Sequence, residues 1–173
     1  MVSASAEARD ALVWRTLGGV PDPEIPVLSV VELGIVREVA WNDDELVVTL
    51  TPTYSGCPAT ETIIADLGRA LACAGFPRHR LEIRLAPAWT TDWITPEAGA
   101  KLAAYGIAPP SARASPFLHT VDVSALRRSR PQVACPRCGS RSTREISRFG
   151  STPCKAQYAC NDCLEPFDYF KPH

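Results

Sequence analysis

The sequence predicts an α/β (α+β) protein: a small mixed three-stranded sheet with helices packed on it, followed by a C-terminal zinc ribbon. Helical and strand-like apolar patterns alternate through residues 1–109. Prolines and glycines punctuate these patterns and separate the elements. Two Cys-x-x-Cys pairs then fall within residues 132–173, where little else could form a core.

The first elements are a helix and a hairpin. Residues 4–17 place apolar side chains at helical spacing ahead of two glycines, which favours a helix that ends there. The three prolines of PDPEIPVLSVVELG, residues 21–34, predict an ordered loop. Residues 35–53 have the pattern of two strands around a turn at 42–44. This segment is therefore a predicted β-hairpin.

A second helix and a third strand complete the predicted sheet. The apolar residues from Pro58 to Ala74 recur at helical spacing, with the proline in the first turn. RLEIRLAP, residues 80–87, alternates apolar and charged residues and predicts a strand with one solvated face. A further short helix is predicted at roughly 96–104. The order helix, hairpin, helix, strand predicts helices on one side of a mixed sheet.

Charge divides the chain into two parts. Residues 1–126 hold 9 basic and 15 acidic residues, a net charge of −6, and residues 127–173 hold 9 and 4, a net charge of +5. We expect an α/β domain over 1–109, a connector over 110–131 and a ribbon over 132–173. The connector contains one strand-like run, PFLHTVDV. The two ends of the chain are therefore expected to do different jobs.

Composition predicts a soluble cytoplasmic protein. Hydrophobic residues make up 46% of the chain, enough for a core, but charges interrupt every apolar run before it reaches membrane-spanning length. The N-terminus shows no basic leader followed by an apolar stretch. Five of the seven cysteines lie between residues 135 and 163. In a reducing compartment such clustering favours metal ligation over disulfides.

The two Cys-x-x-Cys pairs predict a zinc site. Four thiolates from two tight turns joined by a hairpin satisfy tetrahedral zinc without a large core. A rubredoxin-like iron site and a pair of dithiols are the alternatives. A fifth cysteine, Cys154, is expected at the hairpin tip, either as a buried small side chain or as an auxiliary thiol. The predicted zinc ligands are Cys135, Cys138, Cys160 and Cys163.

A basic segment begins before the ribbon and continues into it. Residues 127–148 contain seven arginines and one glutamate, a composition that could bind nucleic acid. The alternative is a solvated basic face that docks on an acidic protein partner. The acidic first part of the chain argues against a dedicated nucleic-acid binder, so nucleic acid is the less favoured partner.

Cys57 is the candidate reactive residue of the first domain. It directly precedes Pro58 at the expected start of a helix, where free N–H groups and the helix dipole stabilise a thiolate. The alternative is a buried structural cysteine. Cys73, late in the same helix, is interpreted as a core or partly buried packing residue. Asp22 and Glu24 could present oxygens to a metal from a proline-stiffened loop. Alternatively, Asp22 caps a turn and Glu24 is solvated.

The sequence lacks the motifs of common enzymes. It contains no Ser-His-Asp order, no phosphate-binding glycine loop and no HExxH motif. The histidines His79, His119 and His173 have no ligand spacing between them. No catalytic residue is predicted, and an enzyme is the less favoured class.

Several segments resemble a known family. DPEIPVLSVVELGIV, TPTYSGCP and the helix after it resemble the SufT-like iron-sulfur cluster assembly domains. PAWTTDWITPEAGAKLAAYGIAPP, CPRCGS, SRFGSTPCKAQYACNDC and EPFDYFKPH resemble the PaaD-type subgroup, which belongs to the phenylacetyl-CoA epoxidase system. The resemblance implies that Asp22 and Glu24 form the family's acidic loop and that Cys57 is its reactive cysteine. It also implies zinc on the four ribbon cysteines, with Cys154 as an extra thiol.

The resemblance implies an accessory role rather than the oxygenase activity itself. The expected function is to assemble or deliver a transient iron or iron-sulfur centre to the epoxidase, especially to its reductase component. A cluster needs about four ligands, so one thiolate at Cys57 would need a second protomer, a partner or small thiols. A homodimer would supply a second such thiolate. The alternatives are an adaptor that stabilises the oxygenase complex, or a nucleic-acid-binding ribbon protein.

Overall fold

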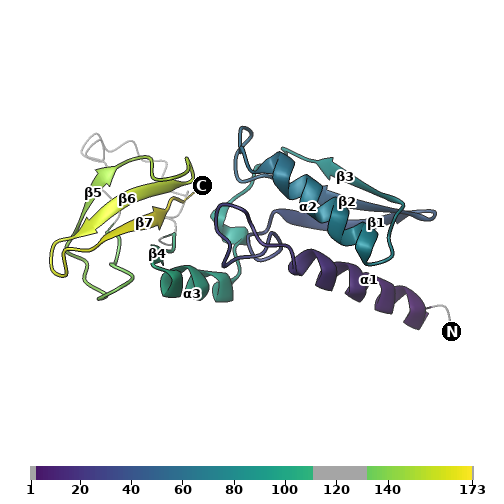
Figure 1. Ribbon diagram of the computed structural model, residues 1–173, viewed down its shortest axis with the longest axis horizontal. Helices are drawn as coiled ribbons and strands as arrows, with labels where there is room; N and C mark the ends of the chain where they lie inside the picture. Colours follow the sequence, from purple (N-terminus) through teal and green to yellow (C-terminus); the bar gives the residue numbers. More distant parts are fainter. Residues whose placement is uncertain (1–2, 111–131, 173) are drawn as a thin grey trace, which may run out of the picture. The chain divides into compact units, whose positions relative to one another are not determined.

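The computed structural model describes residues 3–110 and 132–172, and it contains two compact units, Met1–Lys101 and Leu102–His173 (Figure 1). Side chains are described from residue 6 onward. Except for Pro110, the expected connector, including PFLHTVDV, lies outside the described residues, as do His119 and His173. The domain boundaries expected at 109 and 131 stay a prediction.

The first unit contains the predicted mixed sheet and its helices. Strand β2 pairs antiparallel with β1 and parallel with β3, in the order β1-β2-β3. A 3-10 turn, η1, and a third helix, α3, follow the sheet, and α3 crosses the boundary between the units. The elements are α1 (Ser3–Gly18), β1 (Val36–Asn42), β2 (Glu45–Leu50), α2 (Thr60–Cys73), β3 (His79–Ile83), η1 (Thr91–Trp93) and α3 (Pro96–Tyr105).

One face of the sheet forms the core. Leu46, Val48 and Leu50 of β2 alternate along the strand and are all buried. Helix α1 contacts β1, helix α2 contacts β3, and the two helices contact each other, so both cover this face (Figure 1). The two-residue period of β2 thus directs every second side chain under the helices. The predicted fold class is confirmed for this unit.

The opposite face of the sheet is charged. Arg80 on β3 pairs with Glu45 at 3.4 Å and with Glu82 beside it. Arg84 pairs with Glu38 of β1 at 3.3 Å, which crosses over β2. These side chains are largely solvent-accessible, and such pairs contribute about 0–1 kcal/mol each. These charged side chains therefore form the outer layer of this face, above the buried Thr49, and their ion pairs contribute little to stability.

The segment after β3 fastens the loop before β1. Trp89 Nε1 donates to the Leu33 carbonyl at 2.9 Å, and the Thr95 N–H donates to the Glu32 carbonyl at 3.2 Å. The Glu32 carboxylate pairs with Lys101 at 2.5 Å. Burial raises the pKa of Glu32, but hydrogen bonds from Lys101 and Ser29 outweigh it and hold the pKa below its usual value. The loop therefore has a defined position where it enters β1.

The second unit is a four-stranded sheet in the order β4-β7-β6-β5. Its core includes Tyr158, Phe167 and Tyr169. The predicted hairpin corresponds to β5 and β6, whereas β4 and β7 were not predicted. Pairing of β7 with β6 adds a layer of aromatic residues that sequence reasoning missed. The elements are β4 (Ile107–Ala108), β5 (Thr143–Ser147), β6 (Lys155–Cys160) and β7 (Pro166–Phe170).

Within the described ranges, none of the helices has the length and apolar character needed to cross a membrane.

Gly34 offers a test of the loop anchoring. Its φ is +69°, and a Cβ there would lie 2.7 Å from both Cβ and the carbonyl oxygen of Trp93. Gly34→Ala should therefore lower the free energy of unfolding by about 2–4 kcal/mol, through left-handed strain and overpacking. All four tryptophans lie in residues 1–101, so tryptophan fluorescence in urea reports on this unit.

Gly99→Ala is the matched control, because Gly99 lies in α3 and a Cβ added there would meet no atom within 4 Å. The helix propensity of alanine should leave stability unchanged or raise it by up to about 1 kcal/mol. Equal effects of the two substitutions would contradict the close approach of Gly34 and Trp93.

Candidate functional site

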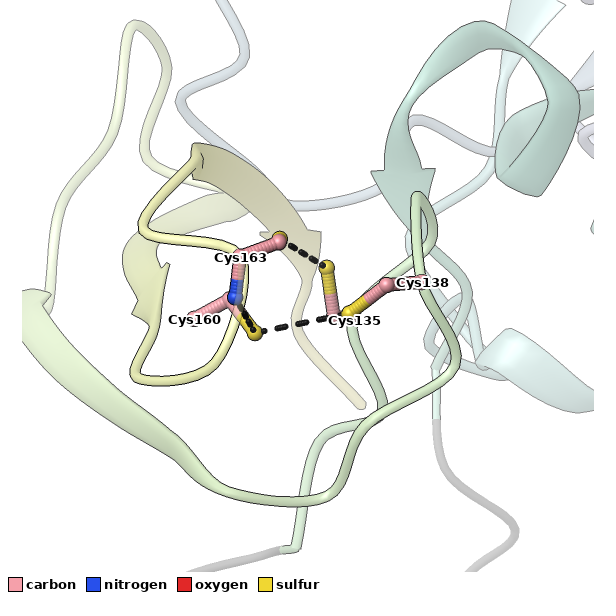
Figure 2. A group of neighbouring side chains, drawn as sticks. All are labelled: Cys135, Cys138, Cys160 and Cys163. Carbon is pink, nitrogen blue, oxygen red and sulfur yellow. Dashed lines mark hydrogen bonds between the residues drawn. The ribbon is translucent and has the colours of Figure 1, made fainter.

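Four cysteines converge at one end of the second unit. Their sulfur atoms all lie within 4.8 Å of one another, and they point toward a common centre from two tight turns (Figure 2). Cys135 Sγ lies 3.8 Å from Cys163 Sγ, and Cys138 Sγ lies 3.6 Å from Cys160 Sγ. A disulfide would require about 2.05 Å. Four sulfurs at about 2.3 Å from a tetrahedral zinc lie about 3.8 Å apart, so the arrangement fits that ion.

The two cysteine turns share one backbone design. In each turn the N–H of the first cysteine donates to the carbonyl five residues later: Cys135 to Ser140 at 2.8 Å and Cys160 to Glu165 at 3.0 Å. The residue after the second cysteine is left-handed in both turns, with φ of +75° at Gly139 and +65° at Leu164. Glycine adopts this conformation easily, but leucine does so at a cost.

Hydrogen bonds within the cysteine group shift the pKa values of Cys138, Cys160 and Cys163. The backbone N–H of Cys163 donates to Cys160 Sγ at 3.5 Å and lowers the pKa of Cys160 to about 7. The N–H of Ser140 acts to lower the pKa of Cys138, but hydrogen bonds with Cys163 and Cys160 raise it to about 12. One thiol thus ionises readily, while a second beside it resists. A bound cation would offset the repulsion between neighbouring negatively charged thiolates.

Cys154 lies apart from this group. It is buried at the end of the loop that connects β5 and β6, the hairpin tip where it was expected, and its Sγ lies 3.0 Å from Thr152 Oγ1. The neighbouring Lys155 is also buried, and its Nζ lies 3.5 Å from Asp168 Oδ2. These contacts favour the interpretation of Cys154 as a buried packing residue, and its role as an auxiliary thiol stays a prediction.

Cys57 is located in a turn before α2. The helix begins at Thr60 with Ala59 as its N-cap, so the expectation that it begins at Pro58 was wrong by two residues. The Cys57 N–H donates to the Tyr54 carbonyl at 3.1 Å, and its own carbonyl accepts from the Thr60 N–H at 3.2 Å. These two bonds, rather than a helix N-cap, hold the half-buried thiol in place.

The Cys57 side chain lines a small, mainly apolar pocket. The pocket lies on the helix-covered face, because Leu50 of β2, Ile63 of α2 and Ile83 of β3 contribute to it. Ile83 is 43% exposed and forms part of its outer wall. Sequence reasoning missed this lining, although the alternation of Leu81, Ile83 and Leu85 marked the face on which Ile83 lies. The other lining residues are Ile35, Pro52, Thr53 and Thr60.

One of the two carboxylates of the acidic loop, that of Asp22, has a structural role. Asp22 is buried, and its Oδ1 accepts from the N–H groups of Glu24 at 2.8 Å and Ile25 at 2.9 Å. Asp22 therefore caps a turn, which was the alternative interpretation. Glu24 is half-buried. Neither residue lines the Cys57 pocket, and their part in binding iron stays a prediction.

The structure also places the other residues considered in the sequence, among them Cys73 and His79. Cys73 is exposed at the end of α2, so the expectation that it packs in the core or is partly buried was wrong. His79 Nδ1 lies 2.8 Å from the Phe76 carbonyl, a local turn contact. Within residues 3–110 and 132–172, the four ribbon cysteines are the only group of three or more metal-ligating side chains close enough to share an ion. Arg127, Arg128 and Arg130 of the basic run lie outside the described residues.

Leu164 and Gly139 give a paired test of the cysteine turns. Leu164 is 78% exposed, so Leu164→Gly should relieve left-handed strain at little packing cost and stabilise the ribbon by up to about 1 kcal/mol. Gly139→Ala should destabilise it by about 1 kcal/mol. Hydrogen exchange of the β6 amides, followed by NMR, measures both. Stabilisation by Gly139→Ala would contradict the shared left-handed geometry.

Comparison with known proteins finds a matching family for a segment of each unit. The family of iron-sulfur cluster assembly proteins matches residues 10–76, and the PaaD zinc beta ribbon domain matches residues 119–171. A crystal structure of a domain of unknown function, DUF59, from Bacillus anthracis is 26% identical with a TM-score of 0.52. It covers 56% of this chain, and the match includes 92% of that structure. The fold of the first unit thus has a solved counterpart.

Two curated relatives extend this result. The "Fe-S protein maturation auxiliary factor" of Porphyromonas gingivalis is 36% identical over 50% of this chain and 83% of its own length. A protein of Escherichia coli, named as a putative subunit of 1,2-phenylacetyl-CoA epoxidase, is 48% identical over 92% of this chain and 90% of its own length. The similarity to the latter spans both units. The chain therefore belongs to the PaaD family, which is associated by name with 1,2-phenylacetyl-CoA epoxidase.

Proposed function

We propose that the protein is a non-catalytic maturation factor for a multicomponent phenylacetyl-CoA epoxidase in aerobic phenylacetate breakdown. It helps to assemble or deliver an iron-sulfur or iron centre, and the reductase component is the recipient. The observation that carries the proposal is the union, in one chain, of an iron-sulfur assembly domain and a PaaD ribbon. Relatives of the first part are named as Fe-S protein maturation auxiliary factors.

Cys57 is the proposed contact with the transferred iron. Its thiol is half-buried, lies inside the segment that matches the assembly family, and borders an apolar pocket. A thiolate binds iron and clusters well, and low water access slows their loss. Cys57 belongs to no group of three or more ligands among the described residues, so a cluster with about four ligands would draw at least part of its ligand set from a second protomer, a partner or small thiols. Incomplete coordination suits a centre that has to be passed on.

The acidic loop supports Cys57 indirectly in this proposal. Asp22 uses one oxygen to hold the loop through two N–H groups. Glu24, which is half-buried, is the candidate oxygen ligand of the pair. The loop continues to Ile35, which lines the Cys57 pocket, so its shape also affects that pocket.

The ribbon is the proposed docking module, held by zinc. Four thiolates close the coordination shell of Zn²⁺ and leave no position for a substrate, as in structural zinc sites. The described arginines of the cysteine turns and β5, Arg137, Arg141 and Arg144, are exposed. They give the ribbon a basic surface, which suits an acidic surface on the recipient.

Zinc content tests the ribbon assignment. The purified protein should contain about one zinc per chain by elemental analysis. Cys160→Ser should lower that content and expose the ribbon to protease, because its fold has a small core and depends on the metal. Cys154→Ser is the control, since this buried cysteine lies outside the group of four and its substitution should leave zinc in place. Stoichiometric iron at the four cysteines would contradict the assignment.

A Cys57→Ala variant tests the transfer role and separates it from the adaptor alternative. In cells, the variant should reduce phenylacetyl-CoA epoxidase activity and the iron and sulfide content of the reductase by at least tenfold. Co-purification with the epoxidase subunits should persist, because the ribbon is intact. Cys73→Ala, the loss of an exposed thiol on α2, should change neither quantity.

An adaptor without a transfer role predicts the opposite result. If the Cys57→Ala strain retains full epoxidase activity and cluster content while ribbon variants lose association, the protein acts only by stabilising the complex.

A further inference from the structure

Strand β3 forms an edge of the three-stranded sheet (Figure 1). The Arg84 N–H donates to the Leu50 carbonyl at 2.8 Å, and the Arg78 carbonyl accepts from the Leu46 N–H at 3.0 Å. Backbone groups alternate sides along a strand, so the even-numbered residues face β2. The N–H and carbonyl groups of Leu81 and Ile83 therefore point outward, where no described strand pairs with them.

The side chains of this edge strand are charged on one face of the sheet and apolar on the other. Edge strands are commonly protected by charges, prolines or bulges. Here the outward-pointing backbone of Leu81 and Ile83 belongs to apolar residues. Ile83 is 43% exposed, and Leu85, two residues beyond the strand, is 55% exposed. On the opposite face Arg80, Glu82 and Arg84 alternate in charge.

We propose that β3 pairs antiparallel with β3 of a second copy, about a two-fold axis that passes through Ile83. In this register Ile83 lies opposite Ile83 of the second copy, and Leu81 lies opposite Leu85. Glu82 lies opposite Arg84 in a non-hydrogen-bonded pair, where side chains come closest. Because of the two-fold symmetry, the Leu81–Leu85 pair and the Glu82–Arg84 pair each occur twice.

The other symmetric registers are less favourable. An axis at Glu82 places Glu82 opposite itself and Arg80 opposite Arg84, which brings like charges together. An axis at Leu81 pairs Arg80 with Glu82 but places Arg78 opposite Arg84 and Ile83 opposite His79. Like charges directly opposite destabilise a strand pair. Charge and apolar burial thus select the Ile83 register and make a second copy of this chain the matching occupant.

This pairing has a consequence for the cysteine pocket. Ile83 and Cys57 line the same pocket, on the helix-covered face of the sheet. An axis through Ile83 therefore places the two Cys57 pockets on either side of it and on the same face of a continuous six-stranded sheet. Two thiolates would then be available for one transferred centre, a step that rests on the proposed function. The pairing itself does not depend on it.

Charge reversal tests the pairing in the full-length protein. Sedimentation equilibrium of wild type should show a reversible dimer. Glu82→Arg and Arg84→Glu should each weaken dimerisation about tenfold, because each creates two like-charge pairs. The double variant, Glu82→Arg with Arg84→Glu, should restore it. Arg80→Glu is the control, since position 80 lies opposite Ala86 in this register, and its dissociation constant should change little.

Cross-linking tests the register. In a Cys57→Ser background, Ile83→Cys should form a disulfide-linked dimer on mild oxidation, because directly opposite residues lie about 5.5 Å apart at Cα. Leu81→Cys alone should not cross-link above the background, but a mixture of Leu81→Cys and Leu85→Cys chains should.

Three results would overturn the proposal. The first is a monomer at every concentration, as when another segment such as PFLHTVDV occupies the edge. The second is a dimer that the single charge reversals do not weaken, and the third is failure of the double variant to dimerise. A monomer in which Cys57→Ala still abolishes cluster delivery would overturn the pairing and leave the proposed function standing. A dimer in which Cys57→Ala has no effect on cluster delivery would overturn the proposed function and leave the pairing standing.

Discussion

The central strand β2 is the constraint on which the first unit depends. It pairs with β1 on one side and β3 on the other, so neither of its edges is free. Its side chains alternate between a helix-covered face, with Leu46, Val48 and Leu50, and an opposite face that carries the charged pairs of the neighbouring segments. A slip of one residue would exchange the two faces and expose the core, which is why the register is strongly determined.

The position of the candidate site follows from this strand. The chain leaves β2 at Leu50 and enters the turn that carries Cys57, so the register of β2 decides where the thiol lies. The same register directs Ile35 from one side and Ile83 from the other toward the cysteine. The loop before β1 is held by Trp89 and Trp93 from a distant part of the sequence. The segments beside Cys57 are thus positioned by tertiary packing and not by local preference alone.

The second unit depends on a different interaction. Its sheet has a core of small and aromatic residues, and the four cysteines bring its two turns together. Sulfur–sulfur contacts of 3.6 and 3.8 Å are close enough for repulsion between thiolates, so the group is expected to be stable only when a cation shares the charge. The left-handed Leu164 shows that the ligand geometry takes precedence over local backbone preference.

The sequence by itself determined the fold class, the main helices and strands of the first unit, and the four cysteines of the ribbon, because these depend on periodicity and on short spacing. It also singled out Cys57 and Asp22. Only the tertiary structure decided what surrounds them: that Asp22 caps its turn, that α2 begins after Cys57 rather than beside it, and that Cys73 is exposed while Cys154 is buried. Strands β4 and β7 and the apolar pocket were also beyond sequence reasoning. Each depends on contacts between residues far apart in the chain, and local patterns carry no information about such contacts.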